Sequence, residues 1–295
     1  VVEAINTKSE NTVFLPGHPL PAGIRATTEM ADLAASEMIL MVCPAQFMRP
    51  VSESLVPHLS KPVPLIICAK GIEKKSGLLM SEVLSETAGG HPIMVLSGPT
   101  FASEVADGLP AAVTLAGEDD ELLSAVAEAI GQPTFRPYWT NDLIGAQIGG
   151  ALKNVLAVAC GIVEGKQLGQ NARAALIARG MMEMLRFAER RGGESKTLMG
   201  LCGLGDLILT CSSLQSRNMS FGKALGEGQS MEEILATRKT VSEGVHSAAI
   251  LYELTEKMQL DLPICTAVYR VLYEKLEVDS AITGLLNRPF QKENS

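Results

Sequence analysis

The first half of the chain alternates short, continuous apolar runs with segments of helical periodicity. Each apolar run has the length of a buried strand. The predicted strands are Met38–Val42, Val63–Cys68, Pro92–Leu96, Ala111–Ala116 and Thr134–Tyr138. The predicted helices between them are Gln46–Leu59, Gly77–Thr87, Phe101–Ala106 and Asp120–Ile130. Buried strands separated by helices are typical of a mostly parallel sheet that is covered on both faces.

The strand-like runs stop after Thr140, and the second half has helical periodicity. Asn141 can cap a long helix that runs to about Glu164, and Asn171 can start another that ends at Gly192. Shorter helices are predicted at Ser213–Gly226, Met231–Ala236, Glu243–Lys257 and Pro263–Lys275. We expect the polar tail from Asn287 to be frayed. The pattern predicts an α/β domain over residues 1–140 and an all-α domain over residues 141–295.

Lys153 lies on a helical face on which its neighbours are small. Gly145, Gly149, Ala157 and Gly161 share this face because they recur every four residues. The rest of the segment is apolar, so we expect the ammonium group to be buried beside a bare groove. Burial lowers the pKa of a lysine toward the range useful for proton transfer. Two interpretations follow: an acid/base catalyst beside space for a small substrate, or a lysine that reaches solvent from a helix packed closely on its glycines.

Charge and composition argue against several classes of protein. The formal net charge of −8 disfavours nucleic-acid binding through a broad basic surface. The six cysteines are widely separated and form no Cys-x-x-Cys pair, so we expect reduced core thiols in a cytoplasmic protein. The four histidines form no pair with metal-ligand spacing, and we expect no metal site. We find no apolar run of membrane-spanning length and no signal peptide, so we expect no membrane insertion.

Three of the predicted strands end in residues that suit ligand binding. They lead into Val42–Ala45, Ala69–Gly71 and Ser97–Thr100. Open parallel sheets bind ligands at the carboxyl ends of their strands, so Lys70 is expected to project into this crevice. The third turn runs into a helix start, where free N–H groups can receive an anion or a hydroxyl. Each turn alone is typical of an ordinary strand end, but together they indicate a binding edge.

The helical half carries a second set of polar candidates. Asp206 directly follows a glycine-rich turn, and Thr210 lies one helical turn further on. Asp206 can cap a helix, or it can orient Lys153 through an ion pair. Arg217 offers a forked donor that suits a phosphate, and Asn218 adds an amide beside it. The alternative for this arginine is an exposed side chain on a helix surface.

In their order and spacing, these residues resemble the bacterial-type NAD(P)-dependent glycerol-3-phosphate dehydrogenases. The resemblance runs from about residue 1 to the C-terminus. The matching segments of the first half are Asn11–Pro16, Val42–Ala45, Ala69–Glu73 and Ser97–Ala102. Those of the second half are Gly149–Val155, Asn171–Arg173, Gly203–Leu207, Gln215–Asn218, Glu243–Gly244 and Leu262–Ile264. The resemblance implies a Rossmann-type α/β domain followed by an all-α domain.

The resemblance also implies a role for each candidate residue. Lys153 matches the catalytic lysine, and Asp206 belongs to the catalytic pocket. The implied substrate-binding residues are Lys70, Gly98, Thr100, Asn154, Thr210, Ser216, Arg217 and Asn218, of which the last three form a phosphate-binding group. The implied cofactor-binding residues are Pro44, Lys70, Ala102, Arg217 and Glu243. The implied cofactor is NAD or NADP.

The implied reaction is the reversible reduction of dihydroxyacetone phosphate to sn-glycerol 3-phosphate. Lys153 would supply the proton, while Arg217 and Asn218 would hold the phosphate. The family resemblance implies that the product feeds phospholipid synthesis, and a homodimer is an expected assembly.

One part of the family pattern is absent from this chain. The family opens with a strand, a Gly-rich turn and a helix, whereas this chain begins Val1-Val2-Glu3-Ala4-Ile5. We therefore expect the chain to begin partway into the domain, with the first βαβ unit incomplete. The strand end that separates NAD from NADP is also missing, so the sequence makes no prediction of cofactor preference.

Two alternative functions stay open at this stage. One is a related dehydrogenase of the same two-domain plan that acts on a non-phosphorylated hydroxy acid. The phosphate-binding group Ser216–Asn218 argues against this alternative. The other is a fragment that no longer catalyses and acts only in binding or assembly. Failure to bind either dinucleotide would favour the fragment.

Overall fold

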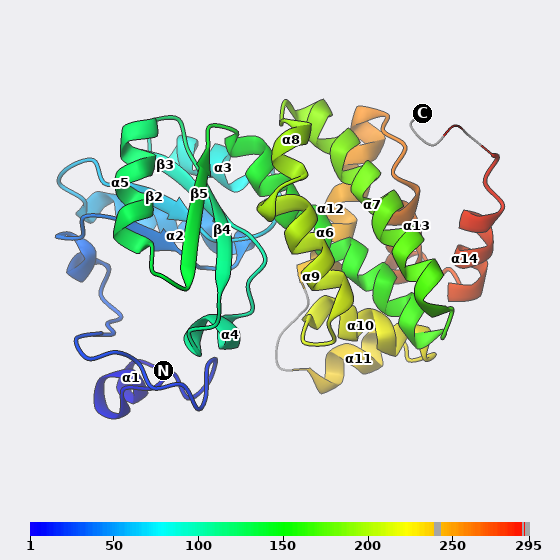
Figure 1. Ribbon diagram of the computed structural model, residues 1–295, viewed down its shortest axis with the longest axis horizontal. Helices are drawn as coiled ribbons and strands as arrows, with labels where there is room; N and C mark the ends of the chain where they lie inside the picture. The colour runs from blue at the N-terminus through cyan, green and yellow to red at the C-terminus, as the bar shows by residue number, and fades with distance from the viewer. Residues whose placement is uncertain (239–242, 291, 293–295) are drawn as a thin grey trace.

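The computed structural model describes residues 1–238, 243–290 and 292. Two halves lie side by side: a first half that contains the sheet, and a helical half (Figure 1). The chain starts below the sheet, and its last described helix lies at the far side of the helical half. Residues 291 and 293–295 of the tail expected to be frayed lie outside the described residues.

Within the described residues, five strands form one sheet in the order β1-β2-β3-β4-β5. They are β1 (Ile39–Met41), β2 (Leu65–Ile67), β3 (Ile93–Ser97), β4 (Ala111–Ala116) and β5 (Phe135–Thr140). β1, β2 and β3 are parallel, β4 is antiparallel to β3, and β5 is parallel to β4. The predicted mostly parallel sheet is confirmed. The carboxyl ends of β1, β2 and β3 therefore lie at one edge of the sheet.

Successive side chains of a strand pack on opposite faces of this sheet. Ile67 points to the face covered by α2 (Met48–Leu55) and α3 (Met80–Thr87), whereas Ile66 points to the face covered by α5 (Asp120–Ile130). Both isoleucines are fully buried. A strand that is covered on both sides needs apolar residues at every position, which explains the continuous apolar runs.

The remaining elements of the first half are short. They are α1 (Val2–Lys8), α4 (Ala102–Ala106) and the 3-10 turns η1 (Met30–Leu33), η2 (Ala45–Phe47) and η3 (Val56–His58). The helix predicted over Gln46–Leu59 is divided into η2, α2 and η3. Pro57 has no N–H to continue the hydrogen-bond pattern of α2, so the helix gives way to η3 at this point.

The helical half is built around α6 (Leu143–Gly165), in which every residue from Gly145 to Val163 is buried. The elements that follow are α7 (Gly169–Arg191), α8 (Ser195–Leu198), the π-helical turn η4 (Leu201–Gly205), α9 (Asp206–Ser212), α10 (Arg217–Gly226), α11 (Met231–Thr237), α12 (Glu243–Met258), α13 (Pro263–Tyr273) and α14 (Val278–Leu286). The sequence pattern did not predict α8 or α14. Only Ala281 of α14 is fully buried, although Val278, Ile282 and Leu285 share its face and pack against the core.

By length and composition, α6 is apolar enough to cross a membrane. This finding corrects the expectation that no apolar run reaches such a length. The apolar stretch is wholly buried inside the structure. Its composition is therefore explained by its position at the centre of the helical half, where protein surrounds it on all sides.

The start of α6 also differs from the prediction, because Asp142 caps the helix and Asn141 does not. Asp142 Oδ1 accepts a hydrogen bond from Gly145 N at 2.8 Å, and its Oδ2 accepts one from Glu194 N at 2.8 Å. The Asn141 side chain instead donates to Asp120 Oδ1 at 3.1 Å. The Asp142 carboxylate thus joins the start of α6 to the segment before α8.

The small residues of α6 bring neighbouring backbones into direct contact. A Cβ atom at Gly161 would lie 2.1 Å from a backbone oxygen of α10, and one at Gly222 would lie 1.9 Å from a backbone oxygen of α6. A Cβ atom at Gly149 would lie 2.2 Å from the backbone oxygen of Cys202. The bare groove expected beside Lys153 is therefore wrong, because other segments fill the space at these glycines.

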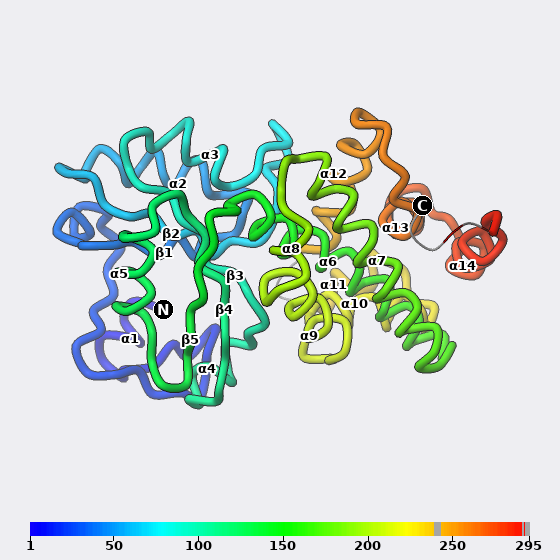
Figure 2. The backbone as a smooth tube through the Cα atoms, turned by 45° about the horizontal axis from the view of Figure 1, so that its top comes forward, coloured from blue at the N-terminus to red at the C-terminus, as the bar shows by residue number. Residues whose placement is uncertain are grey.

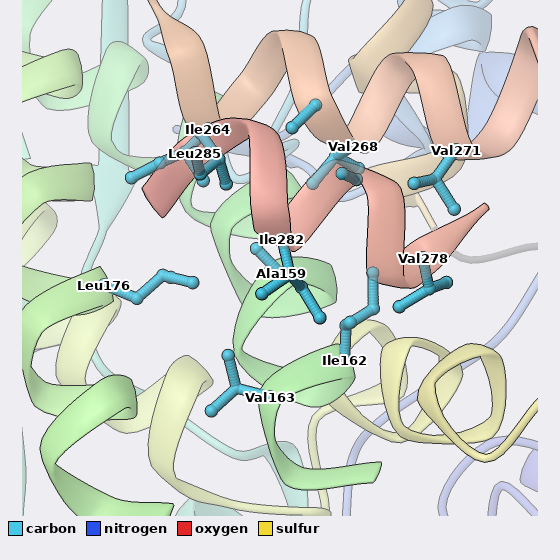
Figure 3. A pocket seen from close by; sticks show the side chains of 12 residues that line it. Ala159, Ile162, Val163, Leu176, Ile264, Val268, Val271, Val278, Ile282 and Leu285 are labelled. Carbon is cyan, nitrogen blue, oxygen red and sulfur yellow. The ribbon is translucent and has the colours of Figure 1, made fainter. Parts of the chain in front are cut away.

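Helix α14 stands at the outer edge of the helical half in both views (Figures 1 and 2). Ile282 and Leu285 of α14, with Ile162 of α6 and Val268 of α13, line an apolar cavity of about 40 Å³ (Figure 3). The lining is almost wholly apolar, so it offers a water molecule almost no hydrogen-bond partner. Aliphatic packing is therefore the main attachment of α14.

A buried carboxylate holds the start of α13. Glu183 of α7 is 1% exposed, and its oxygens accept hydrogen bonds from Ile264 N at 2.6 Å and Cys265 N at 3.1 Å. These N–H groups lie at a helix start, where they have no partner within the helix. Burial raises the pKa of Glu183 to about 7, although the two N–H donors oppose this effect.

We predict that Gly222→Ala strongly destabilises the protein. The added Cβ would lie 1.9 Å from a backbone oxygen of α6, so the two helices must separate. We expect the free energy of unfolding to fall by about 3 kcal/mol or more. Gly284→Ala in α14 is the matched control, because nothing lies within 4 Å of its Cβ position. Urea denaturation followed by circular dichroism measures both variants, and equal midpoints would contradict the observed packing.

We predict that Glu183 makes stability fall as the pH rises from about 4.5 to about 7. In this window the folded protein binds the proton of Glu183 more tightly than the unfolded chain, so losing the proton favours unfolding. The stability of the unmodified protein relative to Glu183→Gln should fall by roughly 3 kcal/mol across this window. Urea denaturation at several pH values measures the difference. Glu256→Gln, an exposed site on α12, should leave the pH dependence unchanged. Parallel pH curves for the unmodified protein and Glu183→Gln would contradict the prediction.

Candidate active site

One buried carboxylate accepts hydrogen bonds from lysines of both halves of the molecule. Asp206, the first residue of α9, is 1% exposed. Its Oδ1 accepts a hydrogen bond from Lys153 Nζ at 2.5 Å, and its Oδ2 accepts one from Lys70 Nζ at 2.7 Å. Lys153 Nζ also donates to Thr210 Oγ1 at 2.9 Å. The ion pair expected from the sequence is present, and Asp206 lies inside a helix and not at its cap.

Lys153 does not reach solvent, because it is only 6% exposed. Burial lowers the pKa of Lys153 to about 8; the positive charge of Lys70 acts in the same direction, and Asp206 opposes both. A lysine with a pKa near 8 has useful populations of both protonation states close to neutral pH. The buried ammonium is therefore suited to proton transfer.

Lys70 reaches Asp206 from the carboxyl end of β2. Its Nζ also donates to Gly98 O at 3.2 Å, in the turn that follows β3. The aliphatic part of Lys70 packs on Gly150 of α6, where a Cβ atom would lie 3.1 Å from Lys70 Cγ. The side chain of Lys70 therefore contacts the ends of two neighbouring strands and the centre of α6.

The turn that leads into Asp206 is tightly packed. The segment Leu201–Gly205 is π-helical, and a Cβ atom at Gly203 would lie 1.9 Å from a backbone oxygen of α8. A Cβ atom at Gly205 would lie 3.5 Å from Pro99, which belongs to the turn after β3. π-helical turns are frequent at functional sites. This one brings Asp206 beside the end of β3.

A chain of amide hydrogen bonds begins at the residue after Lys153. Asn154 Nδ2 donates to Glu243 Oε2 at 3.3 Å, and Asn154 Oδ1 accepts from Asn218 Nδ2 at 2.9 Å. Asn218 Oδ1 in turn accepts from Gly244 N at 2.9 Å. Both asparagines are buried. The chain therefore links α6 and α10 to the first turn of α12.

The other candidates of the phosphate-binding group lie at the start of α10. Ser216 caps this helix, because its Oγ accepts a hydrogen bond from Met219 N at 3.2 Å. The helix therefore begins at Arg217 and not near Ser213, where the sequence pattern placed it. Arg217 is exposed, and its charge acts on Glu243. Burial raises the pKa of the Glu243 carboxyl, whereas the charge of Arg217 lowers it.

The structure brings most of the sequence candidates together. One cluster contains Lys70, Gly98, Lys153, Asp206 and Thr210, and the adjoining amide chain contains Asn154, Asn218 and Glu243. Thr100 is half-buried in the same turn as Gly98. Pro44 is exposed just after β1, and Ala102 is exposed just after the turn that follows β3. Within the described residues, neither forms a hydrogen bond to either cluster.

Sequence reasoning missed two contacts of this site. It paired Asp206 with Lys153 and did not predict that Lys70, 136 positions away in the chain, shares the same carboxylate. It also did not predict the bond between Asn154 and Glu243, which are 89 positions apart. No local pattern signals either contact, because each joins two elements that meet only in the folded chain.

The cysteines and the acidic residues form no further centre in the described part of the chain. All six cysteines are free, and Cys160, Cys202, Cys211 and Cys265 are buried. No group of three or more His, Cys, Asp or Glu side chains among the described residues is arranged to hold a metal ion.

Comparison with known protein families matches both halves of the chain. A family model described as "NAD-dependent glycerol-3-phosphate dehydrogenase N-terminus" matches residues 1–123. The corresponding model for the C-terminus of the same family matches residues 142–283. The two models together cover both the sheet and the helices that carry the clusters described above.

Individual relatives give the same result. Two relatives are glycerol-3-phosphate dehydrogenases (NAD(P)+), one from Parvibaculum lavamentivorans with 53% sequence identity and one from Caulobacter vibrioides with 54%. Each alignment spans 293 residues, which is 99% of this chain and 88% of the relative. A crystal structure of glycerol-3-phosphate dehydrogenase from Coxiella burnetii has a TM-score of 0.93 and 37% identity, covering 97% of this chain and 88% of that chain. The chain therefore belongs to the NAD-dependent glycerol-3-phosphate dehydrogenase family.

Proposed function

We propose that this protein catalyses the reversible, NAD(P)-dependent reduction of dihydroxyacetone phosphate to sn-glycerol 3-phosphate. The proposal is carried by the buried ion pair between Lys153 and Asp206, in a chain that belongs to this dehydrogenase family. In the proposed physiological role, the product supplies glycerol phosphate for phospholipid synthesis.

The carboxyl edge of β1 and β2 fits a nicotinamide dinucleotide. Pro44 is exposed after β1, and Val42 beside it is 72% exposed, so an apolar surface is available for a flat ring. Lys70 keeps 22% of its side chain exposed at the same edge and offers a positive charge to an anionic group. We assign dinucleotide binding to Pro44, Lys70, Ala102, Arg217 and Glu243. The bound dinucleotide supplies or accepts the hydride.

Lys153 is the proposed acid and base of the reaction. In the reduction, its ammonium group donates a proton to the oxygen of the substrate carbonyl; in the oxidation, the neutral amine removes that proton. Asp206 and Thr210 hold the Nζ atom in place. The charges of Lys153, Lys70 and Asp206 together leave a net positive charge, which stabilises a developing alkoxide.

The start of α10 is the proposed site for the substrate phosphate, with Gly98 and Thr100 contacting the rest of the substrate. Ser216 accepts a backbone hydrogen bond through its Oγ, which leaves its O–H free to donate to a phosphate. Arg217 adds a charged, forked donor, and the Asn218 amide is already oriented by its two hydrogen bonds. Binding the phosphate away from the reacting carbonyl would orient that carbonyl toward Lys153.

Three further features stay predictions. We propose that the division between the two domains falls at residue 140, between β5 and α6. A homodimer and a cytoplasmic location are expected from the resemblance described above.

We predict that Lys153→Met abolishes most turnover and leaves the fold intact. The change removes the proton donor but keeps an unbranched side chain of similar length, and Lys70 still pairs with Asp206. We expect kcat for dihydroxyacetone phosphate reduction, followed as oxidation of NADH or NADPH, to fall by about 10³-fold. Lys166→Met, at the end of the same helix and outside the site, is the control. Turnover within tenfold of the unmodified protein would overturn the assignment of Lys153.

We predict that the rate of reduction falls as the pH rises past about 8, because only protonated Lys153 can donate. Lys70→Met should move this falling limb to higher pH by about one unit or more, since it removes a like charge and leaves Asp206 to act on Lys153 alone. The pH profile of kcat/KM, which reports groups of the free enzyme, measures the shift, and Lys74→Met, an exposed lysine nearby, should not change it. A limb that stays in place or moves to lower pH in Lys70→Met would contradict this account.

A further inference from the structure

The first turn of α12 lies directly against the proposed site. Gly244 N donates to Asn218 Oδ1 at 2.9 Å, and the Glu243 carboxylate accepts from Asn154 Nδ2 at 3.3 Å. A Cβ atom at Gly244 would lie 2.6 Å from the backbone oxygen of Asn154, so no side chain fits between this turn and α6. A small displacement of the turn would therefore disturb both asparagine amides.

A stack of three tyrosines joins α12 to α13. The rings of Tyr252 and Tyr269 are 3.9 Å apart between centroids, with 5° between their planes. The rings of Tyr269 and Tyr273 are 5.4 Å apart, with 25° between their planes. Tyr269 and Tyr273 are one helical turn apart on α13, whereas Tyr252 belongs to α12. The stack therefore crosses from one helix to the other and ends at Tyr273.

The hydroxyl of Tyr273 returns from the end of this stack to the start of α12. It donates a hydrogen bond to Val245 O at 2.9 Å, and Val245 directly follows Gly244. A carbonyl oxygen has two lone pairs, so Val245 can accept this bond as well as one within its helix. Val245 and Tyr252 are about two helical turns apart, so α13 contacts α12 at two levels along its axis.

We propose that Tyr273 is a positioning residue, whose hydroxyl holds the first turn of α12 so that Glu243 and Gly244 keep Asn154 and Asn218 in place. This inference rests on the proposed function, in which Asn218 contacts the substrate phosphate and Glu243 contacts the dinucleotide; Asn154 bonds to both of these residues. Tyr273 acts through the backbone of α12, and its place in the stack limits the positions that its ring can take.

Tyr273→Phe tests this role because it removes only the hydroxyl and keeps a ring in the stack. We expect the amide proton of Gly244 to exchange with solvent faster, measured by NMR, because its turn loses an anchor. We expect KM for dihydroxyacetone phosphate and for the dinucleotide to rise about fivefold, with kcat changed less than about twofold, as for loss of a neutral hydrogen bond outside the reacting groups. A purely structural role would lower the amount of active protein and leave KM unchanged.

Tyr252→Phe is the matched control, because Tyr252 belongs to the same stack and its hydroxyl has no hydrogen bond within the described residues. Its Gly244 exchange and KM should equal those of the unmodified protein. Unchanged Gly244 exchange in Tyr273→Phe, faster exchange with unchanged KM, or equal effects of both variants would overturn the proposal. If the unmodified protein oxidises neither NADH nor NADPH with dihydroxyacetone phosphate, the proposed function fails, while the exchange comparison still decides whether the Tyr273 hydroxyl holds the turn.

Discussion

The carboxylate of Asp206 is buried, and an ionised group in such a position is costly unless both of its oxygens have charged or hydrogen-bonded partners. Lys153 satisfies one oxygen from the centre of α6, and Lys70 satisfies the other from the end of β2. Because these lysines come from the two halves of the molecule, the interaction that compensates the buried charge also holds the helical half against the strand ends. The proposed acid/base is therefore placed by one of the contacts between the halves, which also include the hydrogen bond of Gln147 to Ser81 and the ion pair of Arg191 with Glu82.

The packing of α6 explains why a lysine in this position has an altered pKa. Glycines such as Gly149 and Gly161 let other backbone segments approach the helix closely, which excludes water from its length. Lys153 is consequently surrounded by protein, and among the described residues Asp206 and Thr210 accept its hydrogen bonds. Low solvation disfavours the charged form, and the second ammonium group nearby disfavours it further. The close packing that builds the core thus also adjusts the chemistry of the site.

The amide chain extends this arrangement toward the proposed phosphate and dinucleotide sites. Asn154 follows Lys153 on α6, so any shift of that helix moves the proton donor and this amide together. Asn218 and Gly244 then connect the position of α10 to the first turn of α12. A site assembled from several helices needs each of them to be held independently, and Tyr273 supplies such a restraint from a fourth helix.

Local pattern was enough to predict an α/β first half, a helical second half and the sites of all five described strands, because strand and helix periodicity depends on residues close together in the chain. It also indicated Lys153, Asp206 and Arg217 as candidates, whereas Asn154 and Glu243 came only from the family resemblance. The small-residue face around Lys153 was visible in the same way, but its meaning was not, since glycines spaced by four fit both an open groove and a closely packed helix. The sharing of Asp206 by Lys70, across 136 positions, had no local signal. Such contacts arise from the packing of the whole chain, which places strand ends, a π-helical turn and a central helix at one point, and no spacing within a single segment encodes that placement.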